Sequence, residues 1–346
     1  MLIGDRKISD KEKPLFIAEI GINHNGSLSE AKKLVDSCRR AGVEVVKHQT
    51  HIPDQEMSAK EAKKVIPGNS ERNIYEIISD CSLNEEEEYE LMRYVQDSGM
   101  IFISSPFSLA AIDRLESFNV PAYKIGSGEM NNFQMLSKLA KIGKPIIMST
   151  GMHNLKSVQK SIDFLYSINP TQEIALLHTT NLYPTPDELV RLGALGELKA
   201  SFDLNVGLSD HTITNYSSYG AIALGANIIE KHYTDTNERN GPDVVCSVTE
   251  ADCIELLKGI EIIAKQRFGA KTSILEEQVT RDFAFATATL QRDIIRGHTI
   301  TMEDVILKRP NSGSYNSDNL KDLIGKKCVH NLKAGHQILF KDIESS

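Results

Sequence analysis

Residues 227–243 read NIIEKHYTDTNERNGPD, and this stretch decides how the rest of the chain is interpreted. It begins as a buried strand does, with two isoleucines, and then turns polar at Glu230, Lys231 and His232. Side chains alternate between the two faces of a strand, so Glu230 and His232 should share one face. Lys231 should point the other way, toward surrounding helices or solvent, and it is given no role. An acid and an imidazole that share a face at the end of a buried strand indicate a functional site.

Seven more short apolar runs precede this one, and amphipathic segments with helical spacing lie between them. Examples of the helical segments are 28–42, which ends at a glycine, and 83–99, where Asn84 is a candidate N-cap. Eight strand–helix units in roughly 265 residues match a (β/α)8 barrel in number and length. The other predicted strands are 15–21, 43–50, 99–106, 122–129, 144–151, 173–180 and 204–211.

Reactive side chains gather at the ends of these strands, and this favours the barrel over a doubly wound open sheet. Barrel enzymes build their active sites at the carboxyl ends of the strands. The long connection 51–82 is predicted to be a lid or a binding loop. The strand-end residues are Glu19, Lys47, His48, Ser105, Lys124, Ser149, His178, His211, Glu230 and His232.

The C-terminal region differs in character, so we predict a barrel over 1–266, a linker over 267–285 and a small module over 286–346. The module contains a duplication, because RDIIRGHTITMEDV (292–305) aligns with HNLKAGHQILFKDI (330–343) at a constant offset of 38. Repeated glycine turns between β-branched residues predict a mostly β unit with pseudo-twofold symmetry. Such a unit suits binding or assembly.

Composition limits the class of protein. The net charge of −8 argues against a general nucleic-acid binder, so an anionic substrate would need locally clustered lysines. Five scattered cysteines without a CxxC pair fit reduced thiols. There is no apolar leader at the N-terminus and no apolar run of membrane-spanning length, so we expect a cytoplasmic protein that binds no membrane.

Three kinds of chemistry are predicted at the strand ends. Lys47 and Lys124, with serine hydroxyls and the YKIGSGE turn nearby, would suit an anion; the plainer alternative is surface lysines and ordinary turns. His211 and His232 on adjacent strands could hold a divalent metal, although either could be a hydrogen-bonded structural residue. The composition alone does not exclude other histidines near strand ends, namely His24, His48, His51 and His178.

Acids occur beside these groups. Glu19 ends the first strand, Glu230 lies in the last strand, and Asp243 follows in NGPD. A buried carboxylate next to a metal or a lysine either balances charge or acts as a general base. Both interpretations stay open for all three residues.

From about residue 14 onward, the chain resembles the bacterial sialic acid synthases, the N-acetylneuraminate synthase family. The shared stretches occur in collinear order: AEIGINHNGSL, VVKHQTHI, EAKKVIPGNS, MIFISSPFS, YKIGSGE, KPIIMSTGM, HTTNLYPTP, VGLSDHT, LGANIIEKHYTD, GPDVVCS, DFAFAT and LKRPNSG. The resemblance implies a (β/α)8 barrel followed by an antifreeze-protein-like (SAF) domain. It also implies a homodimer in which each cap domain covers the partner's barrel.

The implied reaction is the condensation of phosphoenolpyruvate with N-acetylmannosamine to give N-acetylneuraminate and phosphate, for surface glycans, with Mn2+ or Mg2+ as cofactor. The resemblance makes His211 and His232 the metal ligands, with the metal polarising the aldehyde. It makes Glu19 the acid near the reacting carbons, and Glu230 either participates directly or orients an imidazole. The implied phosphoenolpyruvate-binding residues are Lys47, Ser105, Lys124, Ser127, Ser149 and Asn181. The implied sugar-binding residues are Asn69, Tyr183, Asp243, Phe285 and, from the partner's cap, Arg309.

Three alternatives remain. The first is a legionaminic or pseudaminic acid synthase that uses a 2,4-diacetamido-2,4,6-trideoxyhexose, although KHQTH (47–51) is closer in spelling to the N-acetylneuraminate members. The second is a Schiff-base aldolase with Lys124 as nucleophile. The third is a sugar-sensing or structural protein without catalysis.

Overall fold

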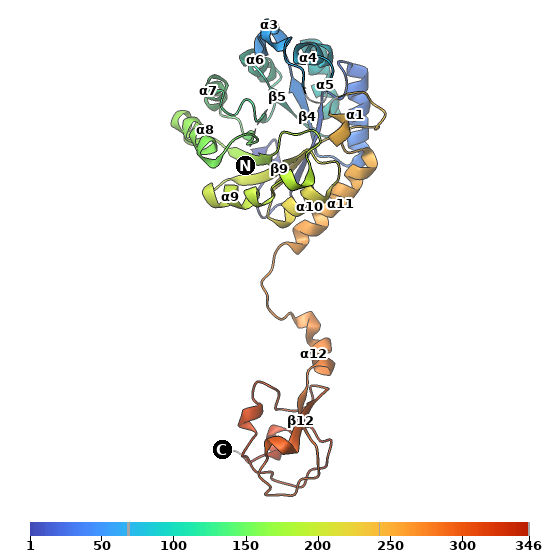
Figure 1. The fold of residues 1–346 in the computed structure, drawn as a ribbon, viewed down its shortest axis with the longest axis vertical. Helices are drawn as coiled ribbons and strands as arrows, with labels where there is room; N and C mark the ends of the chain where they lie inside the picture. Colours follow the sequence, from blue (N-terminus) through green and yellow to red (C-terminus); the bar gives the residue numbers. More distant parts are fainter. Residues whose placement is uncertain (68–69, 242, 345–346) are drawn as a thin grey trace. The chain divides into compact units, whose positions relative to one another are not determined.

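The computed structural model describes residues 1–67, 70–241 and 243–344. The chain divides into two compact units, Met1–Gly269 and Ala270–Ser346, and each has its own hydrophobic core. Both units are coloured along the sequence in Figure 1.

The first unit is a closed barrel of eight parallel strands, ringed by helices (Figure 1). The last strand pairs with the first, in a register from Ile228↔Leu15 to His232↔Glu19, and this pairing closes the sheet. The predicted (β/α)8 class is therefore confirmed, and the open sheet is excluded. The strands are β3 (Leu15–Gly21), β4 (Val45–Thr50), β5 (Ile101–Pro106), β6 (Tyr123–Ile125), β7 (Ile146–Ser149), β8 (Ile174–Thr179), β9 (Asn205–Asp210) and β10 (Ile228–His232).

Helices follow the strands in sequence, and their ends are set by local capping. In α1 the Ser27 side chain accepts from the Glu30 N–H, and Gly42 ends the helix in the left-handed conformation. Asn84 and Glu87 form a capping box at the start of α5, so the N-cap predicted for this helix is present. The outer helices are α1 (Leu28–Ala41), α5 (Glu85–Asp97), α6 (Leu109–Ser117), α7 (Phe133–Ile142), α8 (Leu155–Ile168), α9 (Gly193–Ser201), α10 (Tyr216–Ala223) and α11 (Glu250–Gln266).

Apolar side chains fill the barrel only at the amino ends of the strands. One cluster inside the barrel joins Leu15 and Ile17 of β3 to Ile3 and Ile8 of the N-terminal segment, which contains the hairpin β1 (Leu2–Ile3) and β2 (Arg6–Lys7). A larger cluster lies between the strands and the outer helices. Inward-facing polar residues are therefore left to the carboxyl ends, where the site of a barrel enzyme is expected.

The long connection after β4 contains three short helices: α2 (Pro53–Glu56), α3 (Ala59–Ala62) and α4 (Ile74–Cys81). The buried residues Ile77 and Cys81 of α4 pack against Ile22 in the loop after β3. Two 3-10 helices, Asp187–Leu189 and Val244–Cys246, lie in later loops of the barrel. Among the described residues, no helix combines the length and the apolar character needed to cross a membrane.

The second unit starts with a 3-10 helix (Leu275–Glu277) and α12 (Gln278–Ala284), followed by the antiparallel pair β11 (Thr287–Leu290) and β12 (Val305–Lys308). Its two sequence repeats use the same device. The Asp304 carboxylate accepts hydrogen bonds from the Thr301 amide and from His298, and Asp342 accepts them in the same way from the Leu339 amide and from His336. Three 3-10 helices complete this unit: Met302–Asp304, Leu320–Asp322 and Phe340–Asp342.

Candidate active site

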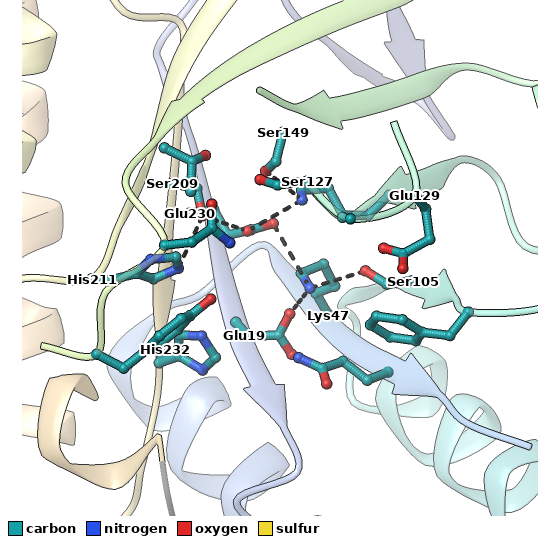
Figure 2. Close-up of a pocket in the computed structure, with 18 residues that line it drawn as sticks. Glu19, Lys47, Ser105, Ser127, Glu129, Ser149, Ser209, His211, Glu230 and His232 are labelled. Carbon is teal, nitrogen blue, oxygen red and sulfur yellow. Dashed lines mark hydrogen bonds and ion pairs between the residues drawn. The ribbon is translucent and has the colours of Figure 1, made fainter. Parts of the chain in front are cut away.

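A cavity of about 240 Å3 opens at the carboxyl ends of the barrel strands, and Figure 2 shows the side chains around it. Most of its polar groups come from inward-facing strand positions. They include the lysines of β4 and β6 and the acids of β3 and β10. The cavity brings together many of the predicted site residues: Glu19, Lys47, Ser105, Lys124, Ser127, Ser149, Asn181, Tyr183, His211, Glu230 and His232.

The two lysines are buried and each is paired. Lys47 contacts Glu19 and donates to the Ser105 hydroxyl over 3.2 Å. Lys124 donates to the Ser149 hydroxyl over 2.7 Å. Burial lowers the pKa of Lys47 to about 7, against the opposing effect of nearby carboxylates. The plainer interpretation of these lysines as surface residues is therefore wrong.

Glu230 lies between both lysines. Its carboxylate oxygens lie 3.6 Å from Lys124 Nζ and 3.9 Å from Lys47 Nζ, and Oε1 accepts from the Ser209 hydroxyl over 2.9 Å. Although burial opposes ionisation, the two lysines hold the pKa of Glu230 below its ordinary value. The floor of the cavity thus carries alternating positive and negative charges.

A second group of polar atoms lies at the loops after β6 and β7. The Gly151 amide donates to the Ser127 hydroxyl over 3.0 Å, and the buried Asn181 Oδ1 has no hydrogen-bond partner among the residues that the structure describes. A Cβ atom on Gly151 would lie 1.8 Å from that oxygen, so glycine is required for Asn181 to approach. The Ser127 and Ser149 hydroxyls and the Lys124 ammonium lie at this side of the cavity, and such donors suit an oxyanion.

His211 and His232 face each other at the ends of β9 and β10, with ring centroids 5.5 Å apart. His211 Nδ1 lies 2.9 Å from the Thr180 carbonyl, so it must carry the proton, which leaves Nε2 as the free nitrogen. His232 Nδ1 is buried 3.6 Å from the Asp243 carboxylate, and within the described parts of the chain it has no hydrogen-bond partner. Burial lowers the pKa of both imidazoles, so both are neutral.

This arrangement fits a divalent metal held by two protein ligands. Neutral imidazoles with free nitrogens at one cavity are metal donors, and an orphaned buried nitrogen needs a partner. In the part of the chain that the structure describes, no group of three or more His, Cys, Asp and Glu side chains is arranged as a metal site. The remaining positions of such an ion would therefore belong to substrate and water.

Three of the other four histidines near strand ends, His24, His48 and His178, are held in different contacts. The rings of His24 and His48 stack on each other, and His48 also bonds to Glu88 of α5 on the outer side of the barrel. His178 bonds to the Val190 carbonyl. These residues therefore have the structural role that the sequence left open.

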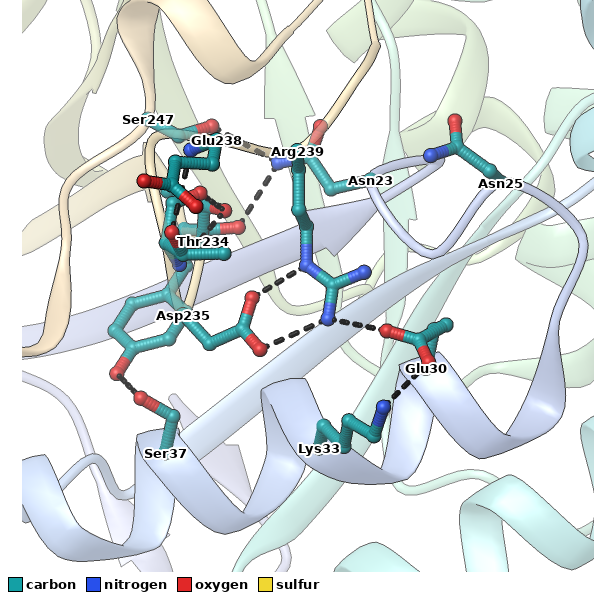
Figure 3. A network of polar contacts seen from close by, with 12 residues as sticks. Asn23, Asn25, Glu30, Lys33, Ser37, Thr234, Asp235, Glu238, Arg239 and Ser247 are labelled. Atoms are coloured by element: carbon teal, nitrogen blue, oxygen red, sulfur yellow. Dashed lines mark hydrogen bonds and ion pairs between the residues drawn. The ribbon is translucent and has the colours of Figure 1, made fainter.

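The segment after β10 is held in place by the contacts drawn in Figure 3. The Arg239 guanidinium pairs with Asp235 in the same segment and with Glu30 of α1, at 2.8 Å each through Nη2. The Asn25 side chain donates to the Asn240 carbonyl. This clamp fixes the segment that leads to Asp243. Burial raises the pKa of Asp243 to about 6.

A second chamber of about 330 Å3 adjoins the first beside His232 and Tyr183. Asp243, Gln49 and His51 are its polar members. Its remaining wall is apolar and comes mainly from the connection after β4. The apolar lining residues are Ile22, Pro67, Ile74, Ile77, Ile78 and Phe107.

Three predicted sugar-site residues are not among the residues described around the two chambers. Asn69 is outside the described residues. Phe285 and Arg309 belong to the second unit, where both are exposed. Conversely, the sequence reasoning missed Gln49, Glu129 and Ser209, all of which line the first cavity. Strand alternation could have found two of them, because Gln49 lies two residues after Lys47 and Ser209 lies two before His211.

Comparisons with known proteins agree with this geometry. The NeuB family matches residues 34–272, and the SAF domain matches residues 286–344, which confirms the expected class of the C-terminal module. The chain is 34% identical to the N,N'-diacetyllegionaminic acid synthase of Campylobacter jejuni, over 93% of this chain and 98% of that protein. It is 31% identical to the pseudaminic acid synthase of Helicobacter pylori, over 97% and 99% respectively.

Among solved structures, the N-acetylneuraminic acid (sialic acid) synthetase of Leptospira borgpetersenii, in complex with citrate, is similar with a TM-score of 0.73. The two chains are 25% identical, and the match covers 81% of this chain and 94% of that one.

Proposed function

Because the chain belongs to the NeuB family, we propose that it condenses phosphoenolpyruvate with the open-chain aldehyde of an N-acylated amino sugar, releasing phosphate and a nonulosonate. The coarser statement, that the chain is a synthase of the sialic, legionaminic and pseudaminic acid type, follows from its relatives. The observation that carries the proposal is a single buried cavity that holds two lysines beside two neutral histidines.

The lysine side of the cavity is assigned to phosphoenolpyruvate. This substrate carries a phosphate and a carboxylate, and Lys47 and Lys124 present two ammonium groups whose hydroxyl partners can also donate. Ser127 and Asn181 add donors at the loop after β6 and the loop after β8. Binding at both anionic ends would orient the enol carbon toward the histidine side.

The histidine side is assigned to the metal, Mn2+ or Mg2+, and the sugar aldehyde. When bound, such a cation would supply Lewis-acid polarisation of the carbonyl. The chain's own part is to present His211 and His232 as neutral ligands, one oriented by the Thr180 carbonyl and both kept unprotonated by burial.

Glu19 and Glu230 line the same cavity, and we assign them to the positive charge that develops during the reaction. Attack of the enol carbon on the aldehyde forms the new C–C bond and leaves a cation at C2, which these carboxylates would stabilise. Water then adds at C2 and loses a proton, and the C–O bond to phosphate breaks as the C2 ketone forms. The bridging oxygen thus leaves with phosphate.

A phosphate-release assay with phosphoenolpyruvate, candidate amino sugars, and metal either added or chelated tests the reaction. Release that needs both the sugar and the metal is expected. Phosphoenolpyruvate labelled with 18O at the bridging position should give labelled phosphate. Label found in the sugar product instead would exclude the C–O cleavage, and release without metal would exclude the metal assignment.

Two sugars are candidates. N-acetylmannosamine is the substrate expected from the KHQTH spelling, and a 2,4-diacetamido-2,4,6-trideoxyhexose is favoured by the apolar chamber. Isoleucines of α4, including Ile74 and Ile77, and Phe107 line that chamber and would contact the sugar. A methyl group at C6 and acetamido methyl groups gain from such a wall, whereas a C6 hydroxyl that packs against these apolar side chains gains no hydrogen bond from them. The relatives at 34% identity named as N,N'-diacetyllegionaminic acid synthases support the same choice.

Comparison of kcat/KM for the two sugars decides between them. An apolar pocket discriminates against an added hydroxyl by about 10- to 100-fold, so the trideoxyhexose should be preferred by a factor in this range. Equal or greater kcat/KM with N-acetylmannosamine would return the assignment to N-acetylneuraminate synthesis.

We also propose a homodimer in which the second unit of each chain caps the partner's barrel with Phe285 and Arg309. Apolar side chains are exposed on the loops that follow the barrel strands, at Met152, Ile213 and Val245. An apolar rim around a polar cavity suits a protein cover. Phe285 is itself 55% exposed on the second unit.

Subunit mixing tests this exchange. Arg309→Ala would remove a proposed contact of the cap and leave the barrel intact, whereas His232→Ala would inactivate the barrel and leave the cap intact. Each homodimer should therefore be inactive. After unfolding and joint refolding, mixed dimers pair one intact barrel with one intact cap, and part of the activity should return. No recovery, together with a monomeric mass by light scattering, would refute the exchange.

A further inference from the structure

A buried ion pair lies directly behind the two histidines. Lys231 of β10 and Asp210 of β9 are partners in the register of these strands, and their side chains are fully buried. The distance between Lys231 Nζ and Asp210 Oδ2 is 3.1 Å. Lys231 therefore faces neither solvent nor the cavity. It points outward from the barrel, into the layer between the strands and the helices. The alternation of side chains along the strand predicted this direction but not the partner.

The pair is embedded in a closed set of hydrogen bonds. Asp210 Oδ1 accepts from the Thr212 amide over 2.9 Å and from its hydroxyl over 2.8 Å. Asp210 Oδ2 accepts from the Ser218 hydroxyl of α10 over 2.7 Å. Lys231 Nζ donates to the Thr212 carbonyl. Both charges are therefore balanced and hydrogen-bonded, as a buried ion pair requires.

These bonds join the backbone segments that carry the two histidines. His211 lies between Asp210 and Thr212, and both of these residues are bonded to Lys231. His232 follows Lys231 directly on the neighbouring strand. Because successive side chains point to opposite faces, the outer ion pair ties together the two backbone segments whose inner side chains are the histidines.

We propose that the Lys231–Asp210 pair is a positioning device that sets the separation and orientation of His211 and His232 for a shared metal ion. The inference rests on the metal site of the proposed function. A pair of apolar side chains could fill the same space, but it would lack the directional bonds that hold the turn at Thr212. Groups that orient metal ligands from behind typically change metal affinity by 10- to 100-fold when removed.

The test uses the full-length protein and Mn2+ alone, with bound ion measured from the loss of the free-ion signal in electron paramagnetic resonance. Lys231→Met and Asp210→Asn each leave one uncompensated group, so each should lower the unfolding midpoint. The double variant, Lys231→Met with Asp210→Asn, removes both charges and should regain most of that midpoint. Its Mn2+ dissociation constant should nevertheless rise by about 10- to 100-fold.

A control is the Arg114–Glu88 pair, which joins α6 to α5 at 3.0 Å, with Glu88 buried and Arg114 partly buried, and which adjoins neither histidine of the proposed metal site. Arg114→Met with Glu88→Gln should change stability but leave Mn2+ affinity within about twofold. Co2+ absorption gives a second measurement, because the ligand-field bands report coordination geometry. These bands should shift in the Lys231/Asp210 double variant and not in the control.

The outcomes separate the two levels of the argument. Wild-type protein that binds no Mn2+ would overturn both the metal site and this inference. Wild-type binding that is matched by the double variant in affinity and in Co2+ bands would overturn the positioning role alone. A loss of affinity of equal size in the control double variant would also overturn it, because the effect would then follow general stability.

Discussion

The substitution Gly151→Ala tests the phosphoenolpyruvate side of the cavity with a single added carbon. The new Cβ would lie 1.8 Å from Asn181 Oδ1 and 2.8 Å from Ser127 Oγ, so at least one of these side chains must move. The backbone of Gly151 is not in the left-handed region, so alanine adds crowding without backbone strain. A hydrogen bond to a charged group is worth about 1.5–3 kcal/mol. Since about 1.4 kcal/mol is a factor of ten, losing one such bond should raise the dissociation constant of phosphoenolpyruvate about 10- to 150-fold.

Isothermal titration with phosphoenolpyruvate measures this constant, and Gly128→Ala is the control. Gly128 lines the same cavity, yet a Cβ there would meet no atom within 4 Å, so affinity should stay within about twofold. A cycle with Asn181→Ala sharpens the test, because the added carbon should cost less affinity once the amide is gone and only the contact with Ser127 Oγ remains. Unchanged affinity in Gly151→Ala, or full additivity with Asn181→Ala, would refute the assignment of this loop.

Three further predictions concern the metal, the sugar and acid stability. His232→Ala should abolish Mn2+-dependent phosphate release. Chelation should cause the same loss in the wild type, and added Mn2+ should restore the wild-type activity. Turnover that persists both in the variant and in the chelated wild type would contradict the ligand assignment. Ile77→Thr should narrow the preference for a 6-deoxy sugar by about threefold or more in kcat/KM, because the added hydroxyl gives a C6 hydroxyl a partner. In the second unit, hydrogen bonds from His298 and the Thr301 amide hold the pKa of Asp304 below its ordinary value, although burial opposes them. This carboxylate therefore stabilises fully above the unfolded pKa of about 3.9 and loses its contribution as the pH falls below it. Hydrogen-exchange protection factors of peptides from this unit, corrected for the intrinsic rate at each pH, should fall over that range, and a variant with Asp304→Asn should show a shallower acid dependence.

Alternation along strands explains how much of the site could be predicted from the sequence. Once the eight strands are placed, the alternation of side chains between the two faces of a strand predicts that Lys47 and Lys124 point inward. It predicts the same for Glu19 and Glu230. The barrel then brings these ends together, because all carboxyl ends of its parallel strands lie at one rim. Neighbouring strands β9 and β10 likewise explain why His211 and His232 meet.

Contacts between distant loops could not be predicted in this way. Arg239 and Glu30 are far apart in sequence, and neither pattern nor spacing indicates that they meet over α1. The chamber wall formed by α4 depends on how an irregular connection folds back, and only Ile77 and its neighbours on that helix show which face is apolar. The alternation of side chains placed Lys231 on the outer face of the barrel but did not predict its partner there. The helices bury that face, so the partner depends on tertiary packing.

Glu230 is the residue whose role the structure sharpens most. The sequence allowed it to orient the His232 imidazole, since both lie on one face of β10. Its carboxylate is instead committed to Ser209, Lys124 and Lys47, and Ser209 Oγ lies 3.5 Å from His211 Nε2. Glu230 therefore connects the anion side of the cavity to the other histidine, through a hydroxyl that could donate to only one of them at a time. Under the proposed function, an anion bound to the two lysines would share their attraction for Glu230, and the carboxylate would then be available to the positive charge of the reaction. The polar end of β10 thus differs between its two faces: Glu230 and His232 line the cavity inside the barrel, and Lys231 pairs with Asp210 on the outer face, where we propose that it positions His232 and His211.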